Sequence, residues 1–467
     1  MTYQHSKTGS IGINIGNTGL HERMRICVQA YDVCAYAYKL RNARVRDYTA
    51  EARKIMTHLV KCRKNCTFAR KFQNIMKKYR ISFAMLIAMV VLSSCTFEFQ
   101  KKPKNVIYLI GDGMGFGAVS SLLLSMEEET GFEKAPVIGL SETCSANNYV
   151  TDSPAGGTAL ATGTRTCNGF LGVGPDSVQL ESLLKKAQKI GKKTGIVVNT
   201  TLTEATPGAF YAGVTSRKES YKIAEQFTES GVDVAIGAGL SAFINRPDSV
   251  DLTAVLIEKG YDVYLNWKSV LGSESEKFVG ILEMSDVHRR NKKSTTIASA
   301  AEGQEVCLAA QLAATEGNVD TTRFSEPTEY LHKACTKALI TLEKNAPKGF
   351  FLMVESAIID GYGHNNDSEG MIEEMQEFDK TLKALIAYVD KHPNTLLVVT
   401  ADHETGGTGV AYKSHEVNEP EGLQLNFSTK GHTGTVVPVF AYGAGAEKFR
   451  GIFQNRELPG IIEGLMK

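Results

Sequence analysis

Residues 105–115 read NVIYLIGDGMG, an apolar run that ends in an aspartate set between glycines. The run Val106–Ile110 is not interrupted by charged residues, which is typical of a parallel strand buried on both faces. Asp112 follows it directly, in the turn. Ligands of open α/β sheets bind beyond the carboxyl ends of the strands, so Asp112 is a first candidate for a functional site.

Further apolar runs of strand length recur along the chain. They are Gly195–Val198, Val234–Ile236, Phe350–Val354, Leu396–Val399 and Val437–Tyr442. Helical stretches lie between several of them, such as 177–190 and 372–390. Strands that alternate with helices predict an α/β fold, in which helices cover both faces of a mainly parallel sheet.

Polar residues gather next to these predicted strands. They are Thr206 after residues 195–198, Glu355, Asp360 and His364 after 350–354, Asp402 and His403 after 396–399, and His432 before 437–442. Carboxylate and imidazole groups together suit zinc, and a set of hard oxygens suits magnesium. The pattern therefore predicts metal binding at one edge of the sheet.

Two local motifs allow other interpretations. Gly113-x-Gly115-x-x-Ala118 after a strand could bind a dinucleotide, but no clear acidic partner ends the next strand, and Asp112 would repel a pyrophosphate. The pair His403-Glu404 begins like a zinc-protease motif, but the second histidine is missing because position 407 is glycine.

Ser153 is the candidate nucleophile. It precedes Pro154 and a run of small residues that ends at Gly163, and a serine before a proline is a sound helix start. Locally, a helix cap explains Ser153 as well as catalysis does. A helix N-terminus also stabilises an anion, and a nearby divalent metal can activate a hydroxyl without a base. A Ser-His-Asp triad is disfavoured because no GxSxG elbow is present.

A second start signal lies inside the chain. Residues 76–95 read MKKYRISFAMLIAMVVLSSC, with a basic start, an apolar stretch and small residues before Cys95. This is the pattern of a secretory signal peptide, and the last four residues resemble the lipobox of bacterial lipoproteins. We expect residues 76–94 to be removed, Cys95 to carry a lipid anchor, and the protein to be exported, as a periplasmic or outer-membrane lipoprotein.

The charge of the 467-residue chain is unevenly distributed. Residues 1–75 hold 14 Lys and Arg against 4 Asp and Glu, whereas the whole chain has a net charge of +1. We expect residues 1–75 to be an over-extended start, with translation beginning at Met76. The alternative interpretation is a basic arm that binds nucleic acid. The CxxxC motif at Cys62 and Cys66 is only a weak indication of zinc binding, because no second pair of ligands accompanies it. The acidic remainder predicts no nucleic-acid partner. We expect residues 95–467 to form one catalytic domain, with surface insertions around 240–325.

Export makes disulfides possible. The four cysteines after Cys95 allow three pairings. Proximity in the sequence favours Cys144–Cys167 and Cys307–Cys335.

Six segments carry a resemblance to the alkaline phosphatase family, in the family's order, over most of residues 104–453. They read NVIYLIGDGMG, VTDSPAGGTALATG, EATPGAFYAGVTSR, GFFLMVESAIIDGYGHNND, TLLVVTADHETGG and GHTGTVVPVFAYG. The resemblance implies a three-layer αβα sandwich, two zinc ions and one magnesium ion per chain, phosphate monoester substrates and a homodimer.

The resemblance also implies roles for single residues. Ser153 is then the phosphorylated nucleophile and Arg217 a fork that grips two phosphate oxygens. The zinc ligands are Asp360, His364 and His432 on the leaving-group side, and Asp112, Asp402 and His403 beside Ser153. Asp112 bridges to magnesium, which Thr206 and Glu355 complete.

Three positions depart from the family pattern: Glu204, Ser356 and Gly361. They leave the set of metal ligands intact, but they bear on which ion occupies the third metal position and on the affinity for phosphate. Besides a phosphomonoesterase, three functions stay open: a diesterase, a sulfatase, and a metal-binding or phosphate-binding protein without turnover. A sulfatase would need the motif Cys/Ser-x-Pro-x-Arg, which the sequence from Ser153 does not match.

Overall fold

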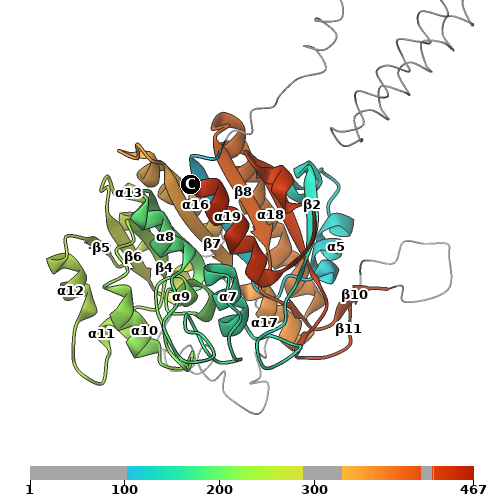
Figure 1. Ribbon diagram of the computed structural model, residues 1–467, viewed down its shortest axis with the longest axis horizontal. Helices are drawn as coiled ribbons and strands as arrows, with labels where there is room; N and C mark the ends of the chain where they lie inside the picture. The colour runs from blue at the N-terminus through green and yellow to red at the C-terminus, as the bar shows by residue number, and fades with distance from the viewer. Residues whose placement is uncertain (1–101, 288–328, 412–422, 424) are drawn as a thin grey trace, which may run out of the picture. The chain divides into compact units, whose positions relative to one another are not determined.

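The computed structural model describes residues 102–287, 329–411, 423 and 425–467 (Figure 1). The predictions for residues 1–75, for the signal segment and for Cys95 and Cys307 lie outside these ranges. No helix within the described ranges is long and apolar enough to cross a membrane. Cys144 and Cys167 are both free thiols, so the predicted pair between them is wrong for this structure.

A ten-stranded sheet forms the centre of the fold. In spatial order its strands are β14 (Gly451–Gln454), β2 (Val137–Glu142), β13 (Val437–Gly443), β8 (Thr395–Thr400), β1 (Asn105–Gly111), β7 (Phe350–Ser356), β3 (Lys193–Thr201), β4 (Val234–Ala238), β6 (Phe278–Leu282) and β5 (Asp262–Tyr264). All six predicted apolar runs are strands of this sheet.

One of the predicted parallel strands has the opposite direction. β13 runs antiparallel to both of its neighbours, β8 and β2, whereas the other neighbouring pairs are parallel. After β8, the described chain forms short strands and turns but no crossover helix, so β13 starts from the edge where β8 ends. A parallel strand would require a crossover back to the opposite edge.

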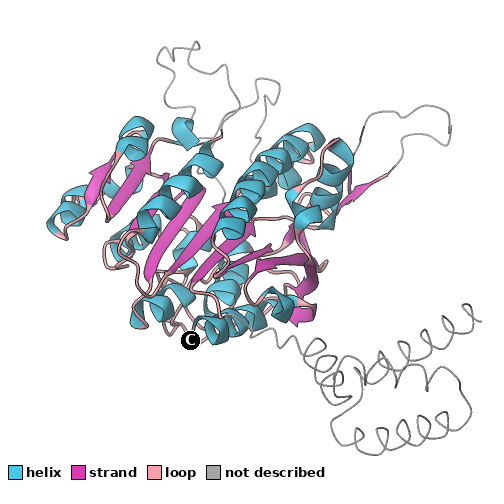
Figure 2. Ribbon diagram, turned by 90° about the horizontal axis from the view of Figure 1, so that it is seen from above, coloured by secondary structure: helices cyan, strands magenta, loops and turns pink. Residues whose placement is uncertain are grey.

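Helices cover both faces of the sheet (Figures 1 and 2). Successive side chains of β1 point to opposite faces of the sheet, so they belong to two separate hydrophobic cores. Val106, Tyr108 and Ile110 pack with α7 (Ser153–Thr162), α8 (Leu183–Lys189) and α19 (Leu458–Met466). Ile107 and Leu109 pack with α5 (Phe116–Ser125), α16 (Tyr330–Glu343) and α18 (Ser368–Lys391). This is the expected three-layer αβα sandwich.

One of the two predicted helices is helical over its whole range, and the other only in part. The stretch 372–390 lies within α18, which Asp367 caps by accepting from Gly370 N at 3.0 Å. The stretch 177–190 is helical only as α8, because Ser177 has a φ of 63° and Ser182 caps the helix that follows. Residues 241–287 add β5 and β6 to one end of the sheet, with α11 (Ser241–Ile244), α12 (Leu252–Glu258), α13 (Trp267–Gly272) and α14 (Met284–Val287) around them.

Candidate active site

Three adjacent strands end at the same level and bring the predicted carboxylates together. Ile110 of β1 pairs with Glu355 of β7 on one side and with Thr400 of β8 on the other. Asp112 and Asp402 therefore follow the ends of neighbouring strands, and Glu355 lies on β7, the neighbour at the other side of β1. Three side chains predicted from separate sequence motifs share one buried edge of the sheet.

The turn after β1 is packed against α17 (Ile358–Asn365) rather than open to a ligand. Gly113 has a φ of 71°, and a Cβ atom at this position would lie 2.8 Å from the Cα atom of Asp360. Its backbone N–H donates to Asp402 Oδ1 at 3.2 Å. A pyrophosphate has no place against this glycine, which argues against the dinucleotide interpretation.

Asp360, His364 and His432 form the outer group of the site. Asp360 and His364 lie four residues apart on α17, hence on one face of the helix. The Nδ1 atoms of His364 and His432 lie 2.5 Å and 3.0 Å from the carbonyl oxygens of Lys430 and Thr151. With a proton on each Nδ1 atom, both Nε2 atoms carry a lone pair, and these two atoms lie only 3.1 Å apart. Two acceptors at this distance require a shared cation or proton.

Asp112, Asp402 and His403 form the inner group, beside Ser153. His403 Nε2 lies 3.1 Å from Ser153 Oγ, 3.2 Å from Asp402 Oδ2 and 3.4 Å from Asp112 Oδ1. Ligand atoms of Asp112, Asp360 and His403 all lie within 4.8 Å of one another, as do those of Asp360, His364 and His432. The candidate nucleophile thus faces a set of nitrogen and carboxylate ligands.

The carboxylates of the site carry more negative charge than the protein around them balances. Burial, followed by the charges of Asp402, Asp360 and Glu355, raises the pKa of Asp112 well above its ordinary value. Burial raises the pKa of Asp402 to about 7. For Asp360 burial acts in the same direction, but hydrogen bonds from His364 and His432 lower its pKa well below the ordinary value. A bound cation would stabilise all these carboxylates in their charged form.

Five buried acceptor atoms at this edge have no hydrogen-bond partner among the described residues. They are Asp112 Oδ1, Thr206 Oγ1, both carboxylate oxygens of Glu355, and Asp402 Oδ2. Buried polar atoms are normally paired, because an orphan costs about 1–3 kcal/mol. Imidazole and carboxylate groups suit zinc, and the hydroxyl and carboxylate oxygens of Thr206 and Glu355 suit magnesium. The residues therefore fit the predicted metal ions.

Ser153 is the first residue of α7, not its cap. The cap is Asp152, whose carboxylate accepts from Ala155 N at 3.1 Å and from Gly169 N at 2.6 Å. Ser153 Oγ is consequently free of the capping role and lies beside His403. Gly156 of α7 allows the helix to approach Asp402, since a Cβ atom there would lie 2.9 Å from the Asp402 carbonyl oxygen.

The three departures from the family pattern have separate structural roles. Glu204 forms an ion pair with Arg217. The Ser356 hydroxyl donates to Glu374 Oε1 at 2.8 Å. Gly361 borders open space, because a Cβ atom there would meet nothing within 4 Å. The first departure bears directly on the site, since it holds the guanidinium predicted to bind phosphate.

Sequence reasoning missed two kinds of supporting residue. Thr405 donates to Asp360 Oδ1 at 2.5 Å and lies 3.2 Å from His403 Nδ1, so it connects the two ligand groups. Behind β7, Glu374 Oε1 accepts from Ser356 and, at 2.9 Å, from Asn199 Nδ2. A glutamate between the buried Met371 and Met375 of α18 was the signal for this second set.

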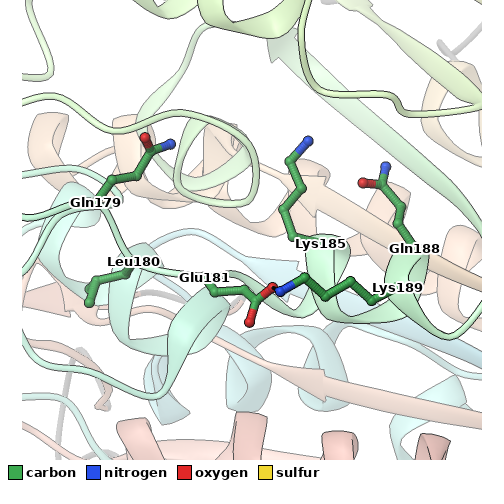
Figure 3. Close-up of a pocket in the computed structure, with 6 residues that line it drawn as sticks. All are labelled: Gln179, Leu180, Glu181, Lys185, Gln188 and Lys189. Atoms are coloured by element: carbon green, nitrogen blue, oxygen red, sulfur yellow. Dashed lines mark ion pairs between the residues drawn. The ribbon is translucent and has the colours of Figure 1, made fainter.

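A hollow lies away from this site, at α8 and the loop before it (Figure 3). It measures about 570 Å³ and is lined by Gln179, Leu180, Glu181, Lys185, Gln188 and Lys189. Lys189 forms an ion pair with Glu181, and Lys185 donates to the Ser230 carbonyl oxygen at 2.6 Å. It shares no residue with the site, and both of its lysines already have partners.

Comparisons with known proteins lead to one family. The alkaline phosphatase family model matches residues 103–424. Alkaline phosphatase 4 of Bacillus subtilis is 28% identical over 444 residues, covering 78% of this chain and 89% of that protein. Alkaline phosphatase of Escherichia coli is 29% identical over 415 residues, covering 77% and 85%.

A solved structure shares the fold as well. The alkaline phosphatase of the Antarctic bacterium TAB5 is 32% identical, with a TM-score of 0.66, and the match covers 78% of this chain and 99% of that one. The family model spans most of the chain, and its range contains the candidate site residues except His432. The chain belongs to the alkaline phosphatase family.

Proposed function

We propose that this protein hydrolyses phosphate monoesters through a phosphoserine on Ser153, with two zinc ions and one magnesium ion bound at the sheet edge. The observation that carries the proposal is Ser153 Oγ, buried and 3.1 Å from His403 Nε2, beside five acceptor atoms without partners. Family membership supports phosphoester hydrolysis in general.

The residues for each ion follow from the groups described above. Asp360, His364 and His432 would hold one zinc, and Asp112, Asp402 and His403 the other, with Asp112 shared with a magnesium held by Thr206 and Glu355. A variant of the TAB5 enzyme was solved with Mg bound in its M3 site, which supports magnesium here. Bound together, these ions would stabilise negative charge on oxygen and lower the pKa of the nucleophilic hydroxyl.

Ser153 performs the covalent step. Its Oγ atom attacks phosphorus, loses its proton to solvent, and the bond from phosphorus to the ester oxygen breaks, so that the alcohol leaves after taking up a proton. Water then attacks the phosphoserine, which releases phosphate and restores the hydroxyl. The start of α7 favours the anion formed beside it, because the N–H groups of a helix N-terminus point toward that end.

Arg217 binds the phosphoryl oxygens. A guanidinium donates two parallel hydrogen bonds, and this geometry matches two oxygens on phosphorus. The ion pair with Glu204 holds it near the site, and Arg217 N donates to the Gly169 carbonyl oxygen at 3.1 Å. The carboxylate of Asp152 lies close enough for the charge of Arg217 to lower its pKa, although burial dominates and raises it.

We further propose export with a lipid anchor at Cys95 and assembly as a homodimer. The anchor is supported by the sequence pattern of residues 76–95 alone. The intact mass of the membrane-extracted protein tests it. A chain beginning at Cys95 with added acyl mass supports the anchor, and a chain beginning before Met76 contradicts it.

One assay separates the monoesterase from its alternatives. Release of p-nitrophenol is measured from p-nitrophenyl phosphate and bis-p-nitrophenyl phosphate, with and without a chelator. We expect the monoester to be preferred and its cleavage to be chelator-sensitive. A preference for the diester would favour a diesterase, and no turnover of either ester would favour a binding protein.

A further inference from the structure

Lysines gather at the edge of the sheet where the parallel strands begin, opposite the candidate active site. Lys104 directly precedes β1, Lys192 directly precedes β3, and Lys348 lies two residues before β7. Lys102 belongs to the segment through which the described chain enters β1, and it is exposed, as are Lys104 and Lys348. Figure 1 shows the start of the described chain at the top, and α7 and α17, two helices of the site, at the bottom. We call these four lysines the basic edge.

Hydrogen bonds join the three strand starts to one another at the basic edge. Lys192 Nζ donates to the carbonyl oxygens of Lys104 at 2.7 Å and of Lys348 at 2.9 Å. A Cβ atom at Gly349 would collide with the Lys104 carbonyl oxygen, so the two backbone segments are in direct contact. Burial lowers the pKa of Lys192, and the charges of Lys104 and Lys348 lower it further. The ammonium groups are therefore close enough to act on one another.

The carboxylates near the basic edge are engaged with other groups. Glu276 forms an ion pair with Lys193 at 3.5 Å, and Glu343 lies 3.1 Å from His392 Nε2. No lysine of the basic edge forms an ion pair with a carboxylate in the part of the chain that the structure describes. The basic edge therefore presents positive charge that the surrounding protein does not neutralise.

The charge of the basic edge contrasts with that of the protein around it. Residues 1–75 carry +10 of a whole-chain net charge of +1, so residues 76–467 carry −9. An anionic surface repels such an acidic domain as a whole but attracts a local group of lysines. The uneven distribution of charge would therefore turn the basic edge toward an anionic surface and the opposite edge, with the active site, away from it.

We propose that the basic edge is a docking surface for the headgroups of anionic phospholipids. Cys95 lies seven residues before Lys102, and an extended chain of this length spans at most about 25 Å. The proposed lipid anchor would thus keep the basic edge near a bilayer, with the active site facing the surrounding solution. Water hydrates the exposed ammonium groups of the free protein, so docking depends on the attraction of charges. The orientation rests on the proposed anchor, whereas the preference for anionic lipid does not.

The rate of lysine acylation tests the contact at single residues. The membrane-extracted protein is placed in vesicles of phosphatidylcholine, alone or mixed with phosphatidylglycerol, and treated with acetic anhydride. Mass spectrometry follows each lysine. We expect Lys104 and Lys348 to react about five-fold more slowly in the anionic vesicles, the factor that matches the attraction of one lysine to an anionic membrane. Salt at about 1 M should remove the difference, because it shortens the Debye length to about 3 Å. Lys218, exposed next to Arg217, should react equally in both vesicles.

A double variant, Lys104→Gln with Lys348→Gln, removes two charges from the basic edge. Lys192 contacts the carbonyl oxygens of these residues, so the substitutions leave the junction of the strand starts in place. The acylation rate of Lys102 should lose most of its dependence on the lipid, and phosphatase activity should be unchanged. Lys218→Gln with Lys222→Gln is the matched control, since it removes the same charge elsewhere and should keep the lipid dependence of Lys102.

Equal acylation of Lys104 and Lys348 in the two kinds of vesicle would overturn the proposal. The same lipid dependence of Lys102 in the wild type and the double variant would also overturn it. Protection of these lysines by soluble DNA, without protection by phosphatidylglycerol, would identify a nucleic-acid surface instead. Failure of the proposed anchor has a different signature: the protein would not sediment with neutral vesicles, and the comparison of acylation rates would still decide the lipid preference.

Discussion

The candidate metal site and the cluster of Asn199, Ser356 and Glu374 are both buried sets of polar groups, but they differ in how well their donors and acceptors are matched. At the candidate metal site five acceptor atoms, four of them on carboxylates, have no hydrogen-bond partner in the part of the chain that the structure describes. A set of buried acceptors without donors lacks a positive partner, which a bound cation would supply.

The second cluster shows what a balanced set looks like. Asn199 of β3, Ser356 of β7 and Glu374 of α18 satisfy one another: the carboxylate accepts from both neighbours, and Asn199 Oδ1 accepts from Ala357 N at 2.8 Å. This cluster therefore needs no ligand. Its carboxylate is still buried, so it should respond to pH rather than to ions.

Removal of metal ions should have the largest effect on the molecule. A chelator should abolish phosphatase activity, and it should also lower the unfolding temperature, because the carboxylates would again lack positive charge. Zinc together with magnesium should restore both. Activity and unfolding temperature that stay unchanged after complete metal removal, checked by elemental analysis, would contradict the assignment of the five acceptor atoms.

Ser153→Ala should come next. It removes the nucleophile but leaves the acceptor set intact, so metal content should be unchanged while kcat falls by about 10³-fold or more. Residual turnover through water is compatible with the proposal. Ser120→Ala on α5 is the control, since Ser120 lies outside the site. A variant at Ser153 that keeps wild-type kcat would exclude the phosphoserine.

Arg217→Ala should have a smaller effect. The loss of two charge-assisted hydrogen bonds should lower kcat/KM by about 2–4 kcal/mol equivalent and weaken phosphate inhibition. Arg217→Lys should recover only part of this, since an ammonium is a point charge. If phosphate inhibition is the same in Arg217→Ala and the wild type, Arg217 does not contact the phosphoryl group.

Sequence patterns predicted which carboxylates and histidines meet at the sheet edge much better than they could predict the residues around them. Asp112, Glu355 and Asp402 each follow an uninterrupted apolar strand, so their meeting at one edge follows from the parallel order of the strands. The sequence pattern predicted Ser153 as the helix cap, but the cap is Asp152, one residue earlier, because aspartate is an equally good capping residue. The opposite direction of β13 had no local signal, since its apolar pattern matches that of a parallel strand.

The Glu204–Arg217 ion pair had no sequence signature. Its two residues come from different segments that meet only in the folded protein, and each is an ordinary residue in its own segment. The sequence marks a site when its ligands recur in a fixed relation to strands. It does not mark a site whose residues share only a final position in space.

The smallest effect should appear in the balanced cluster, as a dependence of stability on pH. Burial raises the pKa of Glu374 to about 7 from an ordinary value of 4.5. Between these values the folded carboxyl keeps its proton while the unfolded one is ionised, so the unfolded state binds fewer protons. The wild type therefore loses stability as pH rises from about 4.5 to 7, by about 3 kcal/mol from this group. Glu374→Gln cannot ionise.

The free energy of unfolding of Glu374→Gln, taken relative to the wild type, should therefore increase by about 3 kcal/mol between pH 4 and pH 8. Denaturant unfolding at several pH values measures this difference, in which contributions common to both proteins cancel. Glu369→Gln, at an exposed position of the same helix, is the matched control and should show a flat difference. A flat difference for Glu374→Gln as well would mean that Glu374 titrates as an ordinary surface carboxyl. The hydrogen bonds from Asn199 and Ser356 would then compensate fully for its burial, and the balanced cluster would hold a charge without any ion.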